Sequence, residues 1–301
     1  MRMPSQVTVV DVGPRDGLQN EQANITTAQK VTFVNLLSEA GVPVIEAGAF
    51  VSPKWVPQMA DTAEVLMDID RRPDTRYPAL VPNLRGFQRA LATGVRDIAV
   101  LAAASETFSR RNINQSIDES LATIKEVCDR AATLDVRVRG YLSTGFGCPY
   151  EGDVDSSRVG ALTKALLDLG VYEVAISDTI GVAHPGQVWK VLDAVSSHAP
   201  LSKVALHFHD TRGTALANVL AGLQAGVTTF DASCGGLGGC PYAPGAAGNL
   251  ATEDLVYMLH GLDIGTGIDL DKLLAASTFA SNRINHPLPS RFFQASRASR
   301  R

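Results

Sequence analysis

Two histidines separated by one residue, His207 and His209, are the clearest candidates for chemistry in this sequence. Alternate residues of a β-strand point to the same side, so both imidazoles can face inward together. This spacing suits two ligands of one metal ion, although two unrelated histidines, one in the core and one capping a loop, would give the same pattern. If Asp16 and Asn249 lie beside them, the set suits Mg²⁺ or Mn²⁺, and Zn²⁺ also fits. Such an ion would act as a Lewis acid with positions open for a substrate.

Two acidic residues, Glu46 and Asp178, fall at the ends of apolar runs that are typical of buried strands. A buried carboxylate is costly unless it is paired or hydrogen-bonded, so each needs a partner, and Arg15 is the obvious one. A structural ion-pair network would explain the same residues. On the functional interpretation, Arg15 faces a developing oxyanion, while Glu46 and Asp178 hold Arg15, the metal-bound oxygens and each other in place.

A glycine-rich segment, residues 235–239, has four glycines among its five residues and runs into Cys240. Glycines are costly in chain entropy and add nothing to packing, so such a loop either approaches a ligand closely or moves. A plain flexible turn is the alternative. The cysteine at its end favours a lid that delivers a thiol, a candidate general acid or base, to the site. Cys128 lies in a helical pattern and is interpreted as a small core residue, whereas Cys148 and Cys234 are left unassigned.

The composition excludes several classes of function. The 301 residues carry 27 basic and 31 acidic side chains, a net charge of −4, with no long Lys/Arg block, which argues against nucleic-acid binding. A hydrophobic fraction of 45% against 19% charged residues predicts a globular fold. Neither a membrane-spanning run nor an export signal is visible, so we expect a cytoplasmic protein. Four cysteines without a Cys-x-x-Cys pair are too few for a disulfide scaffold.

The elements that position these residues repeat along the chain as a short apolar run followed by a helical stretch. The runs are almost continuously apolar, as expected of parallel strands covered on both faces. Strands are predicted over residues 7–13, 42–49, 76–82, 97–104, 137–144, 173–179, 203–210 and 228–234. Helices are predicted over residues 27–40, 84–93, 116–134, 156–169, 186–198, 214–225, 252–262 and 270–283.

Eight such repeats predict an α/β fold, a closed (β/α)₈ TIM barrel with additional C-terminal helices. An open doubly wound sheet is the rival, but it would need a Gly-x-Gly-x-x-Gly turn where this chain has Gly13-Pro14-Arg15-Asp16-Gly17. Residues 1–286 are predicted to form one barrel domain, and residues 287–301 a loose basic tail. Functional groups of such barrels gather at the carboxyl ends of the strands. The candidates that fall there are Arg15, Asp16, Glu46, Asp178, His207, His209, Asn249 and Glu253.

Motifs distributed along nearly the whole chain carry a family resemblance. They lie at residues 12–20 (VGPRDGLQN), 44–47 (VIEA), 50–59 (FVSPKWVPQM), 105–109 (SETFS), 147–152 (GCPYEG), 178–182 (DTIGV), 207–211 (HFHDT), 235–242 (GGLGGCPY) and 248–259 (GNLATEDLVYML). With these motifs the sequence resembles the 3-hydroxy-3-methylglutaryl-CoA lyases. The glycine loop with its cysteine and the GNLATED run are highly specific to these lyases. The Arg-Asp, His-x-His and carboxylate set alone would indicate only the wider superfamily of metal-dependent barrel lyases and Claisen-type synthases.

The resemblance implies a site, a reaction and an assembly. It implies retro-Claisen cleavage of 3-hydroxy-3-methylglutaryl-CoA to acetyl-CoA and acetoacetate, as in leucine degradation and ketone-body formation, by a homodimer. Either Cys240 or His207 would then protonate the enolate carbon. The implied ligands of Mg²⁺ or Mn²⁺ are Asp16, His207, His209 and Asn249. The residues implied to support catalysis are Arg15, Asp16, Glu46, Asp178, His207, Cys240 and Glu253.

The chain departs from the family pattern at several positions, which keeps other functions open. Arg212 and Thr214 stand where relatives often have Tyr and Gln, Phe208 replaces a common Cys, and residues 48–49 are Gly-Ala rather than Thr-Ser. One alternative is a lyase for a longer 3-hydroxy-3-alkylglutaryl-CoA, such as the isohexenyl analogue. Another is a catalytically silent, metal-binding barrel. Residues 110–112 (Arg-Arg-Asn) could bind the coenzyme A nucleotide, or could be an ordinary solvated turn.

Overall fold

The structure, a computed structural model, describes residues 3–239 and 248–298. Within this part of the chain nine parallel strands form one sheet, and each lies inside one of the eight predicted strand segments. The strands are Thr8–Asp11 (β1), Val44–Ile45 (β2), Gly48–Ala49 (β3), Ala79–Leu80 (β4), Asp97–Ala103 (β5), Arg137–Ser143 (β6), Glu173–Asp178 (β7), Val204–Phe208 (β8) and Thr229–Ala232 (β9).

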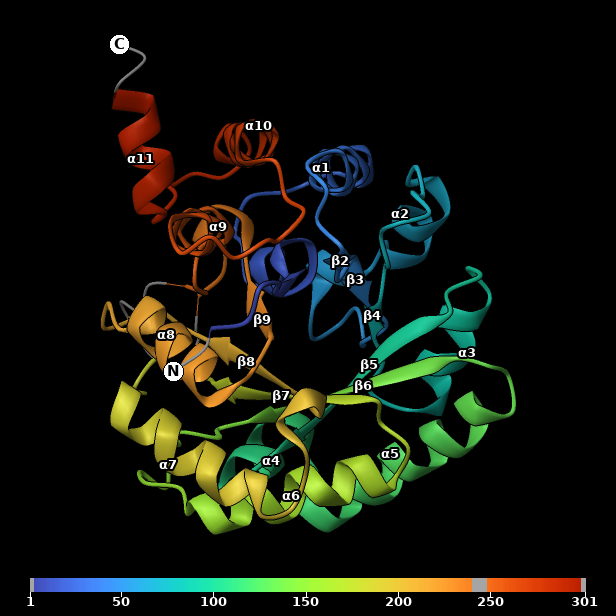
Figure 1. Cartoon of the computed structure of the whole chain (residues 1–301). Helices are drawn as coiled ribbons and strands as arrows, with labels where there is room; N and C mark the ends of the chain where they lie inside the picture. Colours follow the sequence, from blue (N-terminus) through green and yellow to red (C-terminus); the bar gives the residue numbers. More distant parts are fainter. Residues whose placement is uncertain (1–2, 240–247, 299–301) are drawn as a thin grey trace.

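The sheet closes on itself around a central axis (Figure 1). Its strand order is β2-β1-β9-β8-β7-β6-β5-β4-β3, and the two strands at its ends, β2 and β3, are halves of one predicted segment, 42–49. Between these halves, the N–H of Glu46 donates to the carbonyl of Asp11 at 2.9 Å on one side, and the N–H of Ala47 donates to the carbonyl of Pro78 at 3.0 Å on the other. One strand segment therefore joins the first and last edges, and the predicted eight-stranded barrel is confirmed.

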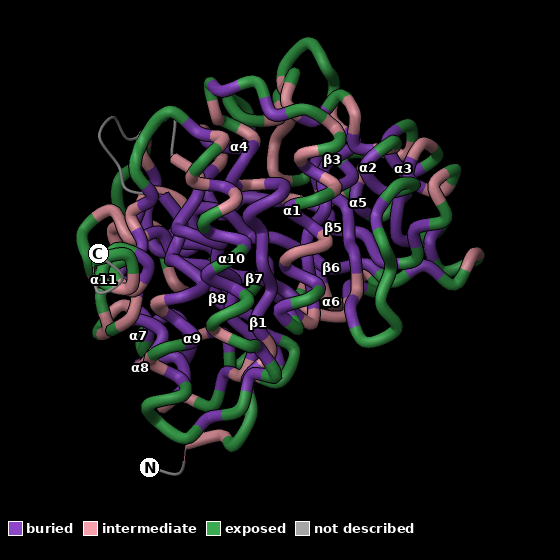
Figure 2. Tube along the Cα trace, turned by 90° about the horizontal axis from the view of Figure 1, so that it is seen from above, coloured by how far each residue is buried: buried purple, intermediate pink, exposed green. Residues whose placement is uncertain are grey.

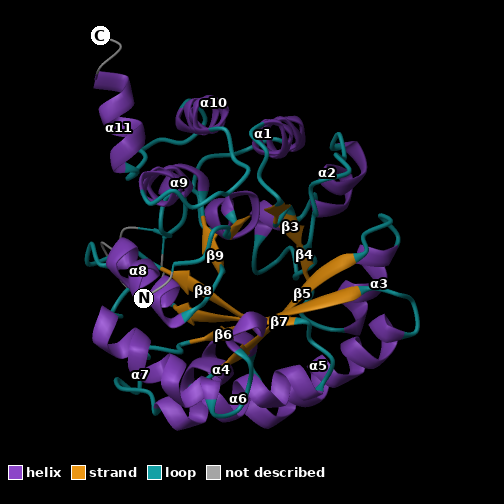
Figure 3. Cartoon of the chain, in the orientation of Figure 1, coloured by secondary structure: helices purple, strands orange, loops and turns teal. Residues whose placement is uncertain are grey.

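Helices surround the barrel on its outside (Figure 3). Eight of them coincide with the predicted helices, with ends that agree within two residues. These are Thr27–Glu39 (α1), Leu84–Leu91 (α3), Ile117–Ala132 (α5), Ser156–Asp168 (α6), Pro185–Ser196 (α7), Ala215–Ala225 (α8), Thr252–Gly261 (α9) and Leu270–Ser281 (α10). The helices that we did not predict are Thr62–Asp68 (α2), Glu106–Ile113 (α4) and Arg291–Ala298 (α11). Short turns of 3₁₀ helix occur at Pro57–Met59, Leu201–Lys203 and Cys234–Gly236.

The barrel strands are buried along almost their whole length, because helices cover their outer faces (Figure 2). Charged residues are nevertheless enclosed among them. Arg139, Glu46 and Asp231 are each at most 1% exposed. Such groups require partners inside the protein. Among the described helices, none combines the length and hydrophobicity needed to span a bilayer.

The C-terminal segment corrects our prediction of a loose tail. Helix α11 forms within it, and Phe293 is 3% exposed. The carboxylate of Asp254, on α9, accepts hydrogen bonds from the N–H groups of Arg291 and Phe292 at 3.0 and 2.8 Å. We did not predict this helix because the basic residues of the segment outnumber its two apolar anchors, Phe292 and Phe293, which pack against the core.

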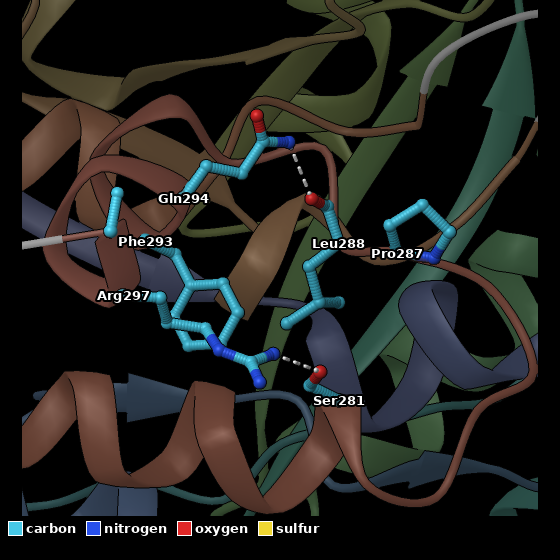
Figure 4. Close-up of a pocket in the computed structure, with 7 residues that line it drawn as sticks. Ser281, Pro287, Leu288, Phe293, Gln294 and Arg297 are labelled. Atoms are coloured by element: carbon cyan, nitrogen blue, oxygen red, sulfur yellow. Dashed lines mark hydrogen bonds between the residues drawn. The ribbon is translucent and has the colours of Figure 1, made fainter. Parts of the chain in front are cut away.

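A pocket of about 360 Å³ opens between α11, the preceding loop and the end of α10 (Figure 4). The side-chain amide of Gln294 donates to the carbonyl of Leu288 at 2.9 Å beside it. The lining residues are Ser281, Pro287, Leu288, Phe293, Gln294, Arg297 and Ala298. They include none of the predicted site residues, so the candidate site lies elsewhere.

Candidate active site and metal centre

Arg15 and Asp16 lie in a single π-helical turn, Gly13–Gly17, directly after β1. The N–H groups of Asp16 and Gly17 both donate to the carbonyl of Val12, at 2.7 and 3.1 Å. A π-turn is rare and occurs most often at functional sites. The turn leaves both side chains at the carboxyl-end face of the barrel, which we call the mouth.

Arg15 is held between two carboxylates. Its Nε lies 2.6 Å from Oε2 of Glu46, and its Nη1 lies 2.6 Å from Oδ1 of Asp16. Glu46 is 0% exposed and also accepts a hydrogen bond from the Tyr141 hydroxyl at 3.2 Å. Burial opposes the charge of Arg15, but the two carboxylates outweigh it and raise the pKa of Arg15 above its ordinary value. The expected pairing of Arg15 with Glu46 is therefore present.

The metal-ligand candidates meet at the same mouth. Donor atoms of Asp16, His207 and His209 all lie within 4.8 Å of one another. Asn249 is brought beside His209 by backbone pairing, since the N–H of Leu250 donates to the carbonyl of Phe208 at 3.0 Å and residues 209 and 249 form a β-bridge. All four predicted ligands thus come together.

The protonation and hydrogen bonding of these groups fit a divalent cation. Although burial opposes it, Arg15 and the two histidines lower the pKa of Asp16 to about 2, so it is ionised. Burial is the main cause that lowers the pKa of His209 to about 4, so its imidazole is neutral at physiological pH. The side-chain nitrogen of Asn249 donates to Asp16 at 2.9 Å and to the carbonyl of Leu237 at 3.0 Å.

Two buried atoms remain for a ligand. Oδ1 of Asn249 and Nδ1 of His209 have no hydrogen-bond partner among the residues that the structure describes. A buried acceptor without a partner is costly, and a cation would satisfy it. The donor set, neutral imidazole with carboxylate and amide oxygen, suits Mg²⁺ or Mn²⁺ and is compatible with Zn²⁺.

Asp178 does not pair with Arg15, contrary to our expectation. Its carboxylate accepts hydrogen bonds from the N–H groups of Val182 and Ala183, at 2.9 and 3.0 Å, and so closes the loop after β7. Burial raises the pKa of Asp178 to about 6. The partners of Asp178 are therefore backbone N–H groups, whereas we had predicted the guanidinium of Arg15.

Glu253, at the start of α9, lies beneath the glycine loop. Its two carboxylate oxygens accept hydrogen bonds from the N–H of Gly235 at 2.8 and 2.9 Å. The Ser277 hydroxyl and the Cys234 thiol also donate to it. Burial raises the pKa of Glu253 to about 7. Glu253 therefore anchors the first residue of the loop.

The other cysteines have buried surroundings. Burial, with nearby Glu253 and Asp11, raises the pKa of the Cys234 thiol well above its ordinary value, which makes it a poor nucleophile. Burial likewise raises the pKa of Cys128 to about 11, in agreement with a core role. Cys148 is 3% exposed. Cys240 lies outside the described residues, so its predicted role as a delivered thiol stays a prediction.

The described part of the glycine loop packs closely over Asn249. Gly238 has a φ of +111°, and a Cβ there would lie 2.6 Å from the side-chain nitrogen of Asn249. A Cβ on Gly248 would lie 1.8 Å from the carbonyl oxygen of Gly238. At these two positions glycine is required by the close approach of the protein's own groups.

Sequence reasoning missed three buried residues inside the barrel, Arg139, Tyr141 and Asp231. Asp231 lies 3.3 Å from Nδ1 of His207 and pairs with Arg139 at 2.7 Å. Their signal was a charged or polar residue at alternate positions of an apolar strand, as at 139 and 141. Each such residue needs a partner on the same inner face.

Three residues that depart from the family pattern, Phe208, Arg212 and Thr214, have defined contacts in the structure. Phe208 packs against Phe146, with ring centroids 5.6 Å apart, on the opposite side of the strand from the two histidines. Arg212 donates to the carbonyls of Ile180 and Gly181 at 3.1 and 2.8 Å, so it holds the loop after β7. The Thr214 hydroxyl donates to that loop as well.

The segment considered for the coenzyme A nucleotide lies on α4. Arg110 forms an exposed ion pair with Glu106 at 2.8 Å. The guanidinium of Arg111 lies over the Tyr150 ring, 4.3 Å from its centroid. The segment is therefore helical rather than a turn, and both guanidinium groups have contacts within the protein.

Comparisons with known proteins agree with this fold and site. Residues 6–280 match the HMGL-like family. Hydroxymethylglutaryl-CoA lyase of Gallus gallus is 51% identical over 97% of this chain and 98% of its own length. The crystal structure of hydroxymethylglutaryl-CoA lyase from Pseudomonas aeruginosa is 50% identical and has a TM-score of 0.97 over 99% of this chain and 100% of that one.

A further solved structure carries ligands. An HMG-CoA lyase from Acinetobacter baumannii, in complex with coenzyme A and 3-methylmalate, is 39% identical with a TM-score of 0.93 over 98% of this chain and 96% of that one. Identity of this order over whole chains, on a barrel with the same arrangement, goes beyond a shared fold. This chain belongs to the HMGL-like family and, within it, to the hydroxymethylglutaryl-CoA lyases.

Proposed function

We infer that this protein is a divalent-metal-dependent carbon–carbon lyase that cleaves 3-hydroxy-3-methylglutaryl-CoA to acetyl-CoA and acetoacetate. One observation carries the inference: the donor atoms of Asp16, His207 and His209 lie within 4.8 Å of one another beside a buried arginine. A cation site next to a guanidinium suits a reaction in which negative charge develops on a thioester oxygen. The names of the relatives support the same substrate.

We assign the cation to Asp16, His207, His209 and Asn249. When bound there, Mg²⁺ or Mn²⁺ supplies Lewis-acid polarisation of the substrate oxygens. The two buried atoms without partners, on His209 and Asn249, support this assignment.

Arg15 is assigned to the enolate. A base at the mouth takes the C3 hydroxyl proton. Cleavage of the C2–C3 bond then releases acetoacetate and leaves the electron pair of that bond on the thioester as an enolate. The ion pairs of Arg15 use Nε and Nη1, so Nη2 can donate to the enolate oxygen. A preorganised donor of this kind contributes about 3 kcal/mol to lowering the barrier.

The remaining residues orient Arg15 and the loops at the mouth, or protonate the enolate carbon. Glu46 fixes the guanidinium of Arg15, Asp178 shapes the loop after β7, and Glu253 anchors the glycine loop. Protonation of C2 completes acetyl-CoA. Of the two donors that the sequence implies, Cys240 and His207, we propose Cys240, because His207 is assigned to the cation. The anionic coenzyme A moiety is expected along the mouth, with Arg111 as one local cation.

A single assay tests the function. Acetoacetate released from 3-hydroxy-3-methylglutaryl-CoA is measured by coupled reduction, with added Mg²⁺, Mn²⁺ or Zn²⁺ and after chelation. We expect metal-dependent release. The isohexenyl analogue cannot yield acetoacetate, so its turnover is followed as loss of the thioester. Turnover of that analogue alone would reassign the substrate, and no turnover of either thioester by folded, metal-loaded protein would leave a silent barrel.

The assembly and location expected from the sequence are part of the proposal. Light scattering after size-exclusion chromatography is expected to give the mass of a homodimer. A fluorescent fusion in the native host is expected to show the cytoplasm.

A further inference from the structure

A buried polar chain runs through the barrel below the mouth, and no step of the proposed reaction uses it. Its centre is Arg139 on β6, which is 1% exposed. The guanidinium donates to both carboxylate oxygens of Asp231 on β9, at 2.7 and 3.1 Å. Its Nε lies 2.8 Å from the carboxylate of Glu173 on β7.

One branch of this chain reaches the cation site. Asp231 and His207 are register partners on β9 and β8, and Oδ2 of Asp231 lies 3.3 Å from Nδ1 of His207. A carboxylate bound by a guanidinium can only accept from the imidazole, so Nδ1 must carry the proton. Nε2 then keeps its lone pair for a cation. Carboxylate partners of this kind orient histidine ligands in metal sites.

The other branch reaches the oxyanion site. Nη1 of Arg139 donates to the Tyr141 hydroxyl at 3.1 Å, and that hydroxyl donates to Glu46 at 3.2 Å. Because its oxygen already accepts from Arg139, the hydroxyl proton is directed toward Glu46, which in turn holds Arg15 at 2.6 Å. The Tyr141 ring also lies between the two guanidinium groups, with centroid distances of 5.2 and 5.1 Å.

We propose that Arg139 and Asp231 are positioning residues that orient both halves of the site: Asp231 directs His207 toward the cation, and Arg139, through Tyr141 and Glu46, directs Arg15 toward the enolate oxygen. The proposal deepens the proposed function and rests on it for the reaction. Its metal branch can be tested without any turnover.

The first test replaces Asp231 by Asn. The amide oxygen will face Arg139, so its NH₂ will face Nδ1 of His207 and force the opposite tautomer. We expect the dissociation constant for Mn²⁺, measured by electron paramagnetic resonance on apoprotein, to rise about 10–100-fold, with a parallel loss of kcat. Glu173→Gln is the matched control, because it removes a carboxylate that pairs with Arg139 but makes no contact with His207. Its Mn²⁺ affinity should match wild type.

The second test replaces Tyr141 by Phe. This removes the hydroxyl that links Arg139 to Glu46 and leaves the contact between Asp231 and His207 in place. We therefore expect kcat to fall about tenfold or more while KM and Mn²⁺ affinity stay unchanged. A purely structural role would lower the melting temperature of all three variants and leave the Mn²⁺ affinity of each the same.

A measurement on wild type covers the case in which Asp231→Asn does not fold. Nitrogen-15 spectra of histidine-labelled apoprotein at pH 8, assigned with a His207→Gln sample, should show His207 with its proton on Nδ1. The Nε2–H tautomer, wild-type Mn²⁺ affinity in folded Asp231→Asn, or an equal loss in Glu173→Gln would overturn the proposal. If the wild-type protein lacks lyase activity, the proposed function is wrong. The Mn²⁺ affinities and the tautomer of His207 would still show whether Asp231 orients His207.

Discussion

Replacement of Arg15 by Gln separates the catalytic from the structural role of the buried arginine. The change removes both ion pairs, each 2.6 Å long, and leaves Glu46 at 0% exposure with Tyr141 as its donor. Breaking a buried pair by removing one partner costs about 3–5 kcal/mol of unfolding free energy. Loss of one preorganised oxyanion donor lowers kcat about 10²–10³-fold.

The double variant Arg15→Gln/Glu46→Gln distinguishes the two effects. It removes both charges, so most of the lost unfolding free energy should return, because neither member of the pair is left alone. Turnover should not return, since the donor to the enolate oxygen is still missing. Urea unfolding measures the first quantity, and acetoacetate release at saturating Mg²⁺ measures the second.

Two results would refute this reasoning. If kcat recovers together with stability in the double variant, Arg15 acts through the fold alone. If metal-saturated Arg15→Gln turns over within about tenfold of wild type, the donor contribution assigned to the guanidinium is absent. Saturation of every variant with Mg²⁺, shown by titration, is the necessary control, because Arg15 also contacts Asp16.

The remaining predictions concern single groups. Asn249→Ala should weaken Mn²⁺ binding, because it deletes the buried amide oxygen, and titration of apoprotein would show an unchanged affinity if the assignment is wrong. Cys240→Ser, assayed in reductant, should alter the pH dependence of kcat; an identical profile would exclude proton transfer by the thiol. Glu253 has a pKa of about 7 in the fold against an ordinary 4.5, so it is protonated in the folded protein where the unfolded chain is ionised. Its contribution to stability is therefore lost as the pH rises from 4.5 to 7, by about 3 kcal/mol, and urea unfolding of Glu253→Gln in chelator should lack that decline.

Periodicity sufficed for the barrel because the strands are mostly apolar on both faces and the long helices bury residues at helical spacing, as α1 does at Phe33, Val34 and Leu37. Helix α2 was not predicted because it is only seven residues long, and helix α4 was not predicted because it is mostly polar. Helix α11 escaped because its basic residues outweighed Phe292 and Phe293, which face the protein.

The candidate site was predictable where chemistry demanded a partner of a given type. Arg15 and Glu46 were paired from sequence because a buried charge needs its opposite. The partner of Asp178 could not be predicted, because backbone N–H groups bind it and every residue except proline has one. Arg139 and Asp231 are 92 residues apart, and nothing in the sequence of either strand indicates that the two residues pair.

The cation site draws its ligands from the two ends of the chain. Asn249 and Asp16 are 233 residues apart and meet across the seam where β9 pairs with β1. During synthesis the site cannot exist until nearly the whole chain has emerged and the ring has closed. An ion that binds only the closed barrel adds its binding free energy to the stability of the folded state, and it does so where β9 pairs with β1. Metal supply in the cell would then affect the stability of the newly made protein as well as its activity.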